Sequence, residues 1–227
     1  MENNNHKKTR GLIVVDMVNG FINEGVLADK YIDTITDEIE RLVKAYLANG
    51  DKVIGIKDCH KADSEEFKHF PPHCIKGTSE SEMVDQLKPY EKHMTVIEKD
   101  EFNAFNAPGF QEAIKGLNDL VVVGCCTDIC VQSLVVSLQE HFKQNEIDAK
   151  VKVPVNGVET FHNLDIGHDR HESNTKAFKV MSEAGAEIVD TVEVSKRANV
   201  KNGLLSAAMA QVTAMVNWCL QPGEKYK

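Results

Sequence analysis

The 227-residue sequence has no long hydrophobic run and no excess of positive charge. Its longest strongly apolar stretches are far shorter than the roughly 20 residues that a membrane-spanning helix needs. Asp and Glu outnumber Lys and Arg by 35 to 26, which gives a formal net charge of -9. Phosphate backbones and anionic lipid surfaces repel such a chain. We therefore expect no nucleic-acid partner and no membrane partner.

Residues 1–10 also lack the apolar core of a secretory signal peptide. We expect this segment to be flexible and the protein to be cytoplasmic. The location bears on the six cysteines, because the cytosol keeps thiols reduced. A chain of this length also builds its core without disulfide bonds. The cysteines are therefore expected to be free thiols that pack, bind a metal or react.

Short β-branched runs alternate with segments of helical periodicity. The runs predict strands at residues 11–15, 52–57, 94–98, 120–123, 151–155 and 187–189. The periodic segments predict helices at residues 31–49, 110–117, 128–142 and 175–184. This alternation predicts an α/β fold, a doubly wound and mainly parallel six-stranded sheet with helices on both faces. We assign the domain to residues 11–195 and a C-terminal helical extension to residues 196–227, with its helix at 202–220.

Polar or reactive residues follow directly after four of the predicted strands. They are Asp16, Asp58, Lys99 and the segment 124–130. Ligands of open α/β sheets bind outside the carboxyl ends of the strands. The sequence therefore brings these residues to one edge of the sheet.

Three cysteines lie close together after the fourth predicted strand. Cys125 and Cys126 continue the apolar run and are expected to pack as small hydrophobic residues. Cys130 falls in the first turn of the next helix, which Thr127 or Asp128 is expected to cap. Unpaired backbone N–H groups and the helix dipole there favour a thiolate, lower its pKa and can hold an oxyanion.

Cys130 is thus the better nucleophile, with packing of all three thiols as the alternative. Asp16 and Lys99 can reach Cys130 at the sheet edge. In such a coupled group the proton can reside on the thiol or on the carboxylate.

The polar segment 59–90 has little periodicity, which is typical of a functional loop. Asp58 and His60 are two positions apart, so their side chains point to the same side in an extended chain. Further potential ligands downstream are Glu65, Glu66, His69 and His73. Two imidazoles with one or two carboxylates suit zinc, iron or manganese, and an ordinary polar loop is the alternative. Residues 162–171 hold a second histidine cluster, which we interpret as a solvated loop or, alternatively, a rim or adventitious metal site.

Together these motifs resemble the cysteine hydrolases of the isochorismatase-like superfamily, most closely its nicotinamidases. The resemblance covers residues 11–190 and rests on DMVNGF at 16–21, EKDEFNAF at 98–105 and GCCTDICV at 124–131. The stretch FPPHCIKGTSES at 70–81 is similar to the sequence around the last metal ligand of nicotinamidases. Val18 and Gly20 stand where the family more often has polar residues.

The resemblance implies the site residues. Its implied catalytic residues are Asp16, Lys99 and Cys130. The implied oxyanion hole consists of the backbone N–H groups of Cys126 and Cys130, preceded by a cis peptide between Cys125 and Cys126. Phe21 and Phe70 are implied to sandwich a flat substrate ring. The implied ligands of one divalent metal ion, with zinc preferred over iron or manganese, are Asp58, His60, Glu66 and His73.

The implied activity is the metal-dependent hydrolysis of nicotinamide to nicotinic acid and ammonia through a thioester, as in NAD salvage. One alternative is another amidohydrolase of the superfamily that acts on a carbamoyl or ureido substrate. A second is a non-catalytic binding protein of the same fold, and a weaker third is metal storage or redox chemistry by the cysteines. A small-molecule substrate and a homo-oligomer are also expected.

Overall fold

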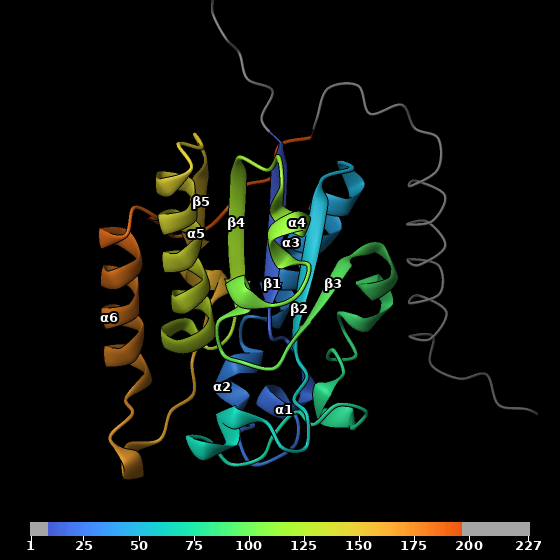
Figure 1. Cartoon of the computed structure of the whole chain (residues 1–227), viewed down its shortest axis with the longest axis vertical. Helices are drawn as coiled ribbons and strands as arrows, with labels where there is room; N and C mark the ends of the chain where they lie inside the picture. The colour runs from blue at the N-terminus through green and yellow to red at the C-terminus, as the bar shows by residue number, and fades with distance from the viewer. Residues whose placement is uncertain (1–8, 197–227) are drawn as a thin grey trace, which may run out of the picture.

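The computed structural model describes residues 9–196 (Figure 1). Six strands form one sheet in the order β3-β2-β1-β4-β5-β6, and every pair is parallel. The strands are β1 Arg10–Val15, β2 Lys52–Asp58, β3 Thr95–Lys99, β4 Asp119–Gly124, β5 Lys150–Pro154 and β6 Glu187–Val189. The predicted doubly wound sheet is therefore confirmed. Residue 10 of the segment expected to be flexible belongs to β1, and the predicted helix at 202–220 lies outside the described residues.

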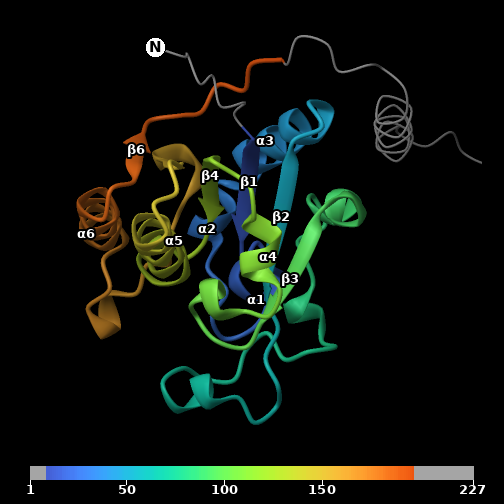
Figure 2. The same ribbon diagram turned by 45° about the horizontal axis from the view of Figure 1, so that its top comes forward.

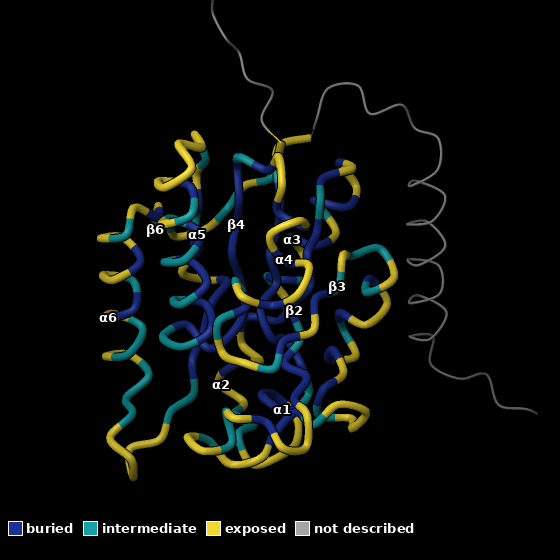
Figure 3. Tube along the Cα trace, in the orientation of Figure 1, coloured by how far each residue is buried: buried dark blue, intermediate teal, exposed yellow. Residues whose placement is uncertain are grey.

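Helices pack on both faces of this sheet. They are α1 Asn19–Ile22, α2 Lys30–Asp33, α3 Thr36–Ala48, α4 Phe110–Ile114, α5 Gln132–Gln144 and α6 Arg170–Glu183. One face buries side chains such as Ile13 and Ile54 against α4, α5 and α6, and the other buries Leu12 and Val53 against α3. Figure 2 shows α5 and α6 side by side, and the buried strands run through the centre in Figure 3.

Two predicted helices differ from the structure for local reasons. The predicted helix 31–49 is divided into α2 and α3, because the Thr34 hydroxyl donates to the Tyr31 carbonyl at 2.6 Å and ends α2. Helix α6 begins at Arg170 rather than at 175, because the Asp169 carboxylate accepts from the backbone N–H groups of His171 and Glu172. The interpretation of residues 162–171 as a loop is therefore wrong at its C-terminal end.

The connections at the carboxyl ends of the strands carry most of the irregular structure. The segment between β2 and β3 contains short 3-10 turns, among them Glu65–Lys68, and its first part, drawn in teal, lies below the strands in Figure 1. Gly124, at the end of β4, has φ +118° and lies so close to β1 that a Cβ would sit 2.0 Å from the Val15 carbonyl oxygen. Between residues 9 and 196, no helix has the length and apolarity of a membrane span.

Candidate active site

Lys99 lies at the centre of a buried polar group at the sheet edge. Its ammonium nitrogen is 2.9 Å from Asp16 Oδ2, 2.7 Å from Asp58 Oδ1 and 3.8 Å from Cys130 Sγ. The four residues come from the ends of β1, β2 and β3 and from the turn after β4. All four side chains are buried. The prediction that the side chains of Asp16, Lys99 and Cys130 lie together at one edge of the sheet is therefore confirmed.

Asp16 has the backbone and the electrostatic environment of a functional carboxylate. Its φ of +52° lies in the left-handed region, which non-glycine residues rarely occupy. Burial raises its pKa to about 7, while the Lys99 charge lowers it, the Asp58 charge raises it and a hydrogen bond from the Cys130 thiol lowers it. A carboxylate that titrates near neutral pH is suited to accept and return a proton.

The expectation that helix geometry lowers the pKa of Cys130 is wrong. Burial raises this pKa well above its ordinary value; the Lys99 ammonium lowers it, and the negative charges of Asp16 and Asp58 raise it. The resting residue is consequently a thiol that needs a base. Burial tends to lower the pKa of Lys99, but the charges of Asp16 and Asp58 raise it, so the ammonium stays charged.

The local structure around Cys130 also departs from the prediction. Residues Thr127–Val131 form a π-helical turn that precedes α5, and neither Thr127 nor Asp128 caps it with a side chain. Instead, the Asp128 carboxylate accepts from the Thr160 hydroxyl at 2.6 Å. The peptide between Cys125 and Cys126 is cis, as the resemblance implies. Cys125 and Cys126 are buried, as predicted.

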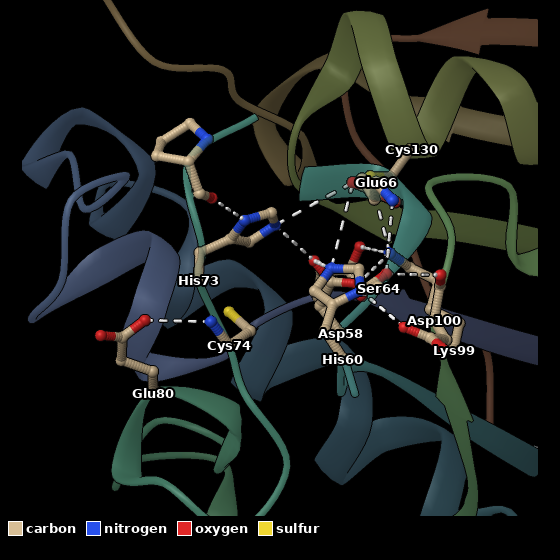
Figure 4. A network of polar contacts seen from close by, with 12 residues as sticks. Asp58, His60, Ser64, Glu66, His73, Cys74, Glu80, Lys99, Asp100 and Cys130 are labelled. Carbon is tan, nitrogen blue, oxygen red and sulfur yellow. Dashed lines mark hydrogen bonds and ion pairs between the residues drawn. The ribbon is translucent and has the colours of Figure 1, made fainter. Parts of the chain in front are cut away.

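Four side chains converge beside this group in a pattern suited to a metal ion. Single ligand atoms of Asp58, His60, Glu66 and His73 all lie within 4.8 Å of one another. The Nε2 atoms of His60 and His73 lie 3.0 Å and 3.2 Å from Asp58 Oδ2, and each is 4.0 Å from Glu66 Oε1. Figure 4 shows the four side chains pointing toward one another, next to Lys99 and Cys130.

Each imidazole is held at Nδ1 by an oxygen outside the cluster and presents its Nε2 atom to Asp58. His60 Nδ1 lies 3.1 Å from Asp100 Oδ1, and His73 Nδ1 lies 2.8 Å from the Pro71 carbonyl oxygen. Both oxygens are acceptors, so each Nδ1 is placed to donate to its oxygen, and each Nε2 faces the Asp58 carboxylate. A divalent ion bound here would take these Nε2 atoms as ligands.

The remaining donors fit a divalent ion as well. Buried Glu66 Oε2 and His60 Nε2 have no hydrogen-bond partner among the described residues. Two imidazoles and two carboxylates are the ligand types of zinc, iron and manganese sites. Sequence analysis missed the supporting contacts of Asp100 and Pro71. An acidic residue directly after Lys99 was the available signal for Asp100.

A pocket of about 420 Å³ is lined by residues of the group around Lys99 and by residues of the potential metal site. Its lining includes Cys126, Cys130, Asp58, Glu66, His73, Phe21, Phe70 and Phe161. An apolar cavity of ~150 Å³ holds a benzene molecule, so one aromatic ring with a carboxamide fits here. Both phenylalanines predicted to hold the ring, Phe21 and Phe70, line this pocket. A hollow of about 710 Å³ lies near the amino end of β4, but no cysteine lines it.

Comparisons with known proteins agree with this fold. The chain matches the isochorismatase domain family over residues 10–193 and belongs to it. Nicotinamidase 1 of Arabidopsis thaliana is 35% identical over 150 residues, which cover 59% of this chain and 61% of that protein, less than two thirds of its length. The crystal structure of nicotinamidase PncA from Bacillus subtilis has a TM-score of 0.68 and 28% identity, covering 80% of this chain and 99% of that one.

Another solved structure has the same fold but belongs to a protein with a different activity. N-carbamoylsarcosine amidase from Thermoplasma acidophilum has a TM-score of 0.68 at 23% identity, and the match covers 82% of this chain and 99% of that one. Because one fold supports different amide substrates, the substrate has to be argued from the site.

Proposed function

We propose that this protein is a nicotinamidase, a metal-dependent cysteine amidohydrolase that converts nicotinamide to nicotinic acid and ammonia in NAD salvage. The observation that carries the proposal is the buried contact of Lys99 with Asp16, Asp58 and Cys130, beside the convergent ligand atoms of the metal group. Asp58 belongs to both groups, because Oδ1 contacts Lys99 and Oδ2 faces the two imidazoles.

In the proposed reaction, the substrate ring binds between Phe21 and Phe70 with its carboxamide against Cys130. Asp16 accepts the thiol proton, and the sulfur attacks the carboxamide carbon. The backbone N–H groups of Cys126 and Cys130 stabilise the oxyanion. None of the backbone hydrogen bonds between the described residues engages the N–H of Cys126 as donor.

The C–N bond then breaks, and Asp16 returns its proton to the departing ammonia. A water molecule, deprotonated by Asp16, attacks the resulting thioester and releases nicotinic acid and the free thiol. Lys99 keeps its positive charge throughout and stabilises the carboxylate and the thiolate in turn. A divalent ion held by Asp58, His60, Glu66 and His73 would supply a Lewis acid that orients the ring and withdraws electron density from it.

An ammonia-release assay on nicotinamide tests the proposal. The panel includes a carbamoyl and a ureido compound, because the same thiol chemistry acts on their C–N bonds. Cys130→Ala is expected to abolish turnover and to leave the metal content unchanged. Cys59→Ala is the matched control, since Cys59 is buried but does not line the pocket. Ammonia release by Cys130→Ala at the wild-type rate would refute the assignment of the nucleophile.

A further inference from the structure

The segment after β5 forms one wall of the pocket and is bound to the turn that carries Cys130. The backbone N–H of Thr127 donates to the Glu159 carbonyl at 3.1 Å. Two residues further along, Phe161 lines the same pocket as Cys130. This wall and the turn that carries Cys130 are therefore in direct contact, although about 30 residues separate them in the sequence.

His168, from the second histidine cluster, connects these two parts through its side chain. Its Nε2 lies 2.8 Å from Asp128 Oδ2 in the nucleophile turn, and its Nδ1 lies 3.0 Å from the Phe161 carbonyl oxygen. The imidazole also stacks on the Phe161 ring, with centroids 3.8 Å apart and an angle of 8° between the planes. Each ring nitrogen therefore lies within hydrogen-bond distance of an oxygen.

We propose that His168 is a positioning residue that fixes the aromatic wall Phe161 against the nucleophile turn through Asp128. Phe161 lines the pocket proposed to hold the substrate ring, and Asp128 is two residues before Cys130. One imidazole thus sets the distance between the bound ring and the attacking sulfur. A displacement of about 1 Å in such a pair can lower the rate by about a hundredfold.

The wall has independent anchors, so removal of the imidazole leaves the chain folded. The Glu159 carboxylate accepts from Arg170 at 2.5 Å and from Asn174 at 2.6 Å, both on α6. The backbones of Asn163 and His168 exchange two hydrogen bonds, of 2.9 Å and 2.8 Å. The loop therefore does not need the His168 side chain to stay in place, and this side chain can serve to position Phe161.

The inference rests on the proposed function, and two variants separate the two contacts of the imidazole. His168→Phe keeps a ring against Phe161 but loses both polar contacts of the imidazole, so kcat for nicotinamide is expected to fall about tenfold with KM within twofold. His168→Gln keeps an amide donor for Asp128 but loses the stack, so KM is expected to rise about fivefold with kcat within threefold. His171→Gln is the matched control, because His171 is exposed on α6.

The variants are measured as metal-loaded full-length protein, with active sites counted by titration of Cys130. In His168→Phe, alkylation of Cys130 by iodoacetamide at pH 7 is expected to slow at least threefold. This measurement needs no amide substrate. In the double variant, Asp128→Asn is expected to lower kcat by less than a further threefold below that of His168→Phe, because the two residues act through one contact.

Three results would overturn the inference. In the first, both His168 variants keep the wild-type kcat and KM. In the second, both variants lose the same activity and also melt at a lower temperature. In the third, the kcat losses of His168→Phe and Asp128→Asn are fully additive. Failure of the wild type to hydrolyse nicotinamide would instead contradict the proposed function alone. The alkylation rates of the His168 variants would then still decide the positioning role.

Discussion

Replacing Lys99 by Met tests the electrostatic core of the site most directly. The substitution keeps a side chain of similar length but removes the ammonium that contacts Asp16 at 2.9 Å and Asp58 at 2.7 Å. Two buried carboxylates then lose their shared counter-charge. Loss of one partner from a buried ion pair costs about 3–5 kcal/mol of unfolding free energy. We expect a loss in this range at pH 8 and nearly complete loss of ammonia release.

The loss of stability should depend on pH in a defined direction. The pKa of Asp16 in the folded protein, about 7, already lies above its ordinary value. A raised folded pKa contributes stability below the unfolded pKa and loses it as pH rises through the folded pKa. Without the Lys99 charge the folded pKa rises further, so near pH 6 Asp16 protonates and the loss is smaller. The deficit relative to wild type grows from pH 6 to pH 8 by at most about 1.4 kcal/mol per pH unit.

Urea unfolding of the metal-free protein at pH 6 and pH 8 measures both effects. Lys76→Met provides the control, because it removes an exposed ammonium that pairs with Glu98 on the surface, and it should leave both midpoints unchanged. A Lys99→Met loss below about 1 kcal/mol would refute the reasoning. So would a deficit that shrinks as the pH rises.

Three further predictions concern neighbouring features. The profile of kcat/KM for the metal-loaded protein should show an acid limb, because Asp16 has to be deprotonated to act as base. Burial raises the pKa of Asp16 to about 7 and a bound divalent ion lowers it again, so the midpoint should lie at or below about pH 7. Activity that stays constant down to about pH 5 would contradict it. Asp100→Asn should weaken zinc affinity roughly 10–100-fold in a chelator competition, since Asp100 orients His60; unchanged affinity would remove that role. Gly124→Ala should lower the melting temperature sharply or prevent folding, because its Cβ would overlap the Val15 carbonyl.

The convergence of Asp16, Asp58 and Lys99 was predictable from sequence because parallel strands end at one edge of the sheet. Asp16, Asp58 and Lys99 each follow or end a strand that the β-branched runs identify. Strand order and pairing then determine that these ends are neighbours, without any knowledge of the loops. The metal group was less accessible, because Glu66 and His73 lie on an irregular segment whose path no periodicity describes.

The supporting contacts were beyond sequence reasoning for a related reason. Asp128 resembles a helix cap, yet its partners Thr160 and His168 lie 32 and 40 residues away. The pairing depends on how the segment after β5 folds back over the nucleophile turn. The pKa of Cys130 was misjudged because the helix dipole was weighed without burial and without Asp58, which becomes a neighbour only through Lys99.

The double role of Asp58 explains why the two groups adjoin. Its Oδ1 binds Lys99 and its Oδ2 faces His60 and His73, so one carboxylate links the proton-transfer group to the metal group. Asp16, Asp58 and Glu66 bring three buried or half-buried carboxylates against a single ammonium. A divalent cation held by Asp58, His60, Glu66 and His73 would balance the charge that Lys99 leaves uncompensated. It would also lower the cost of ionising Asp16, so metal binding and the basicity of Asp16 are expected to be coupled.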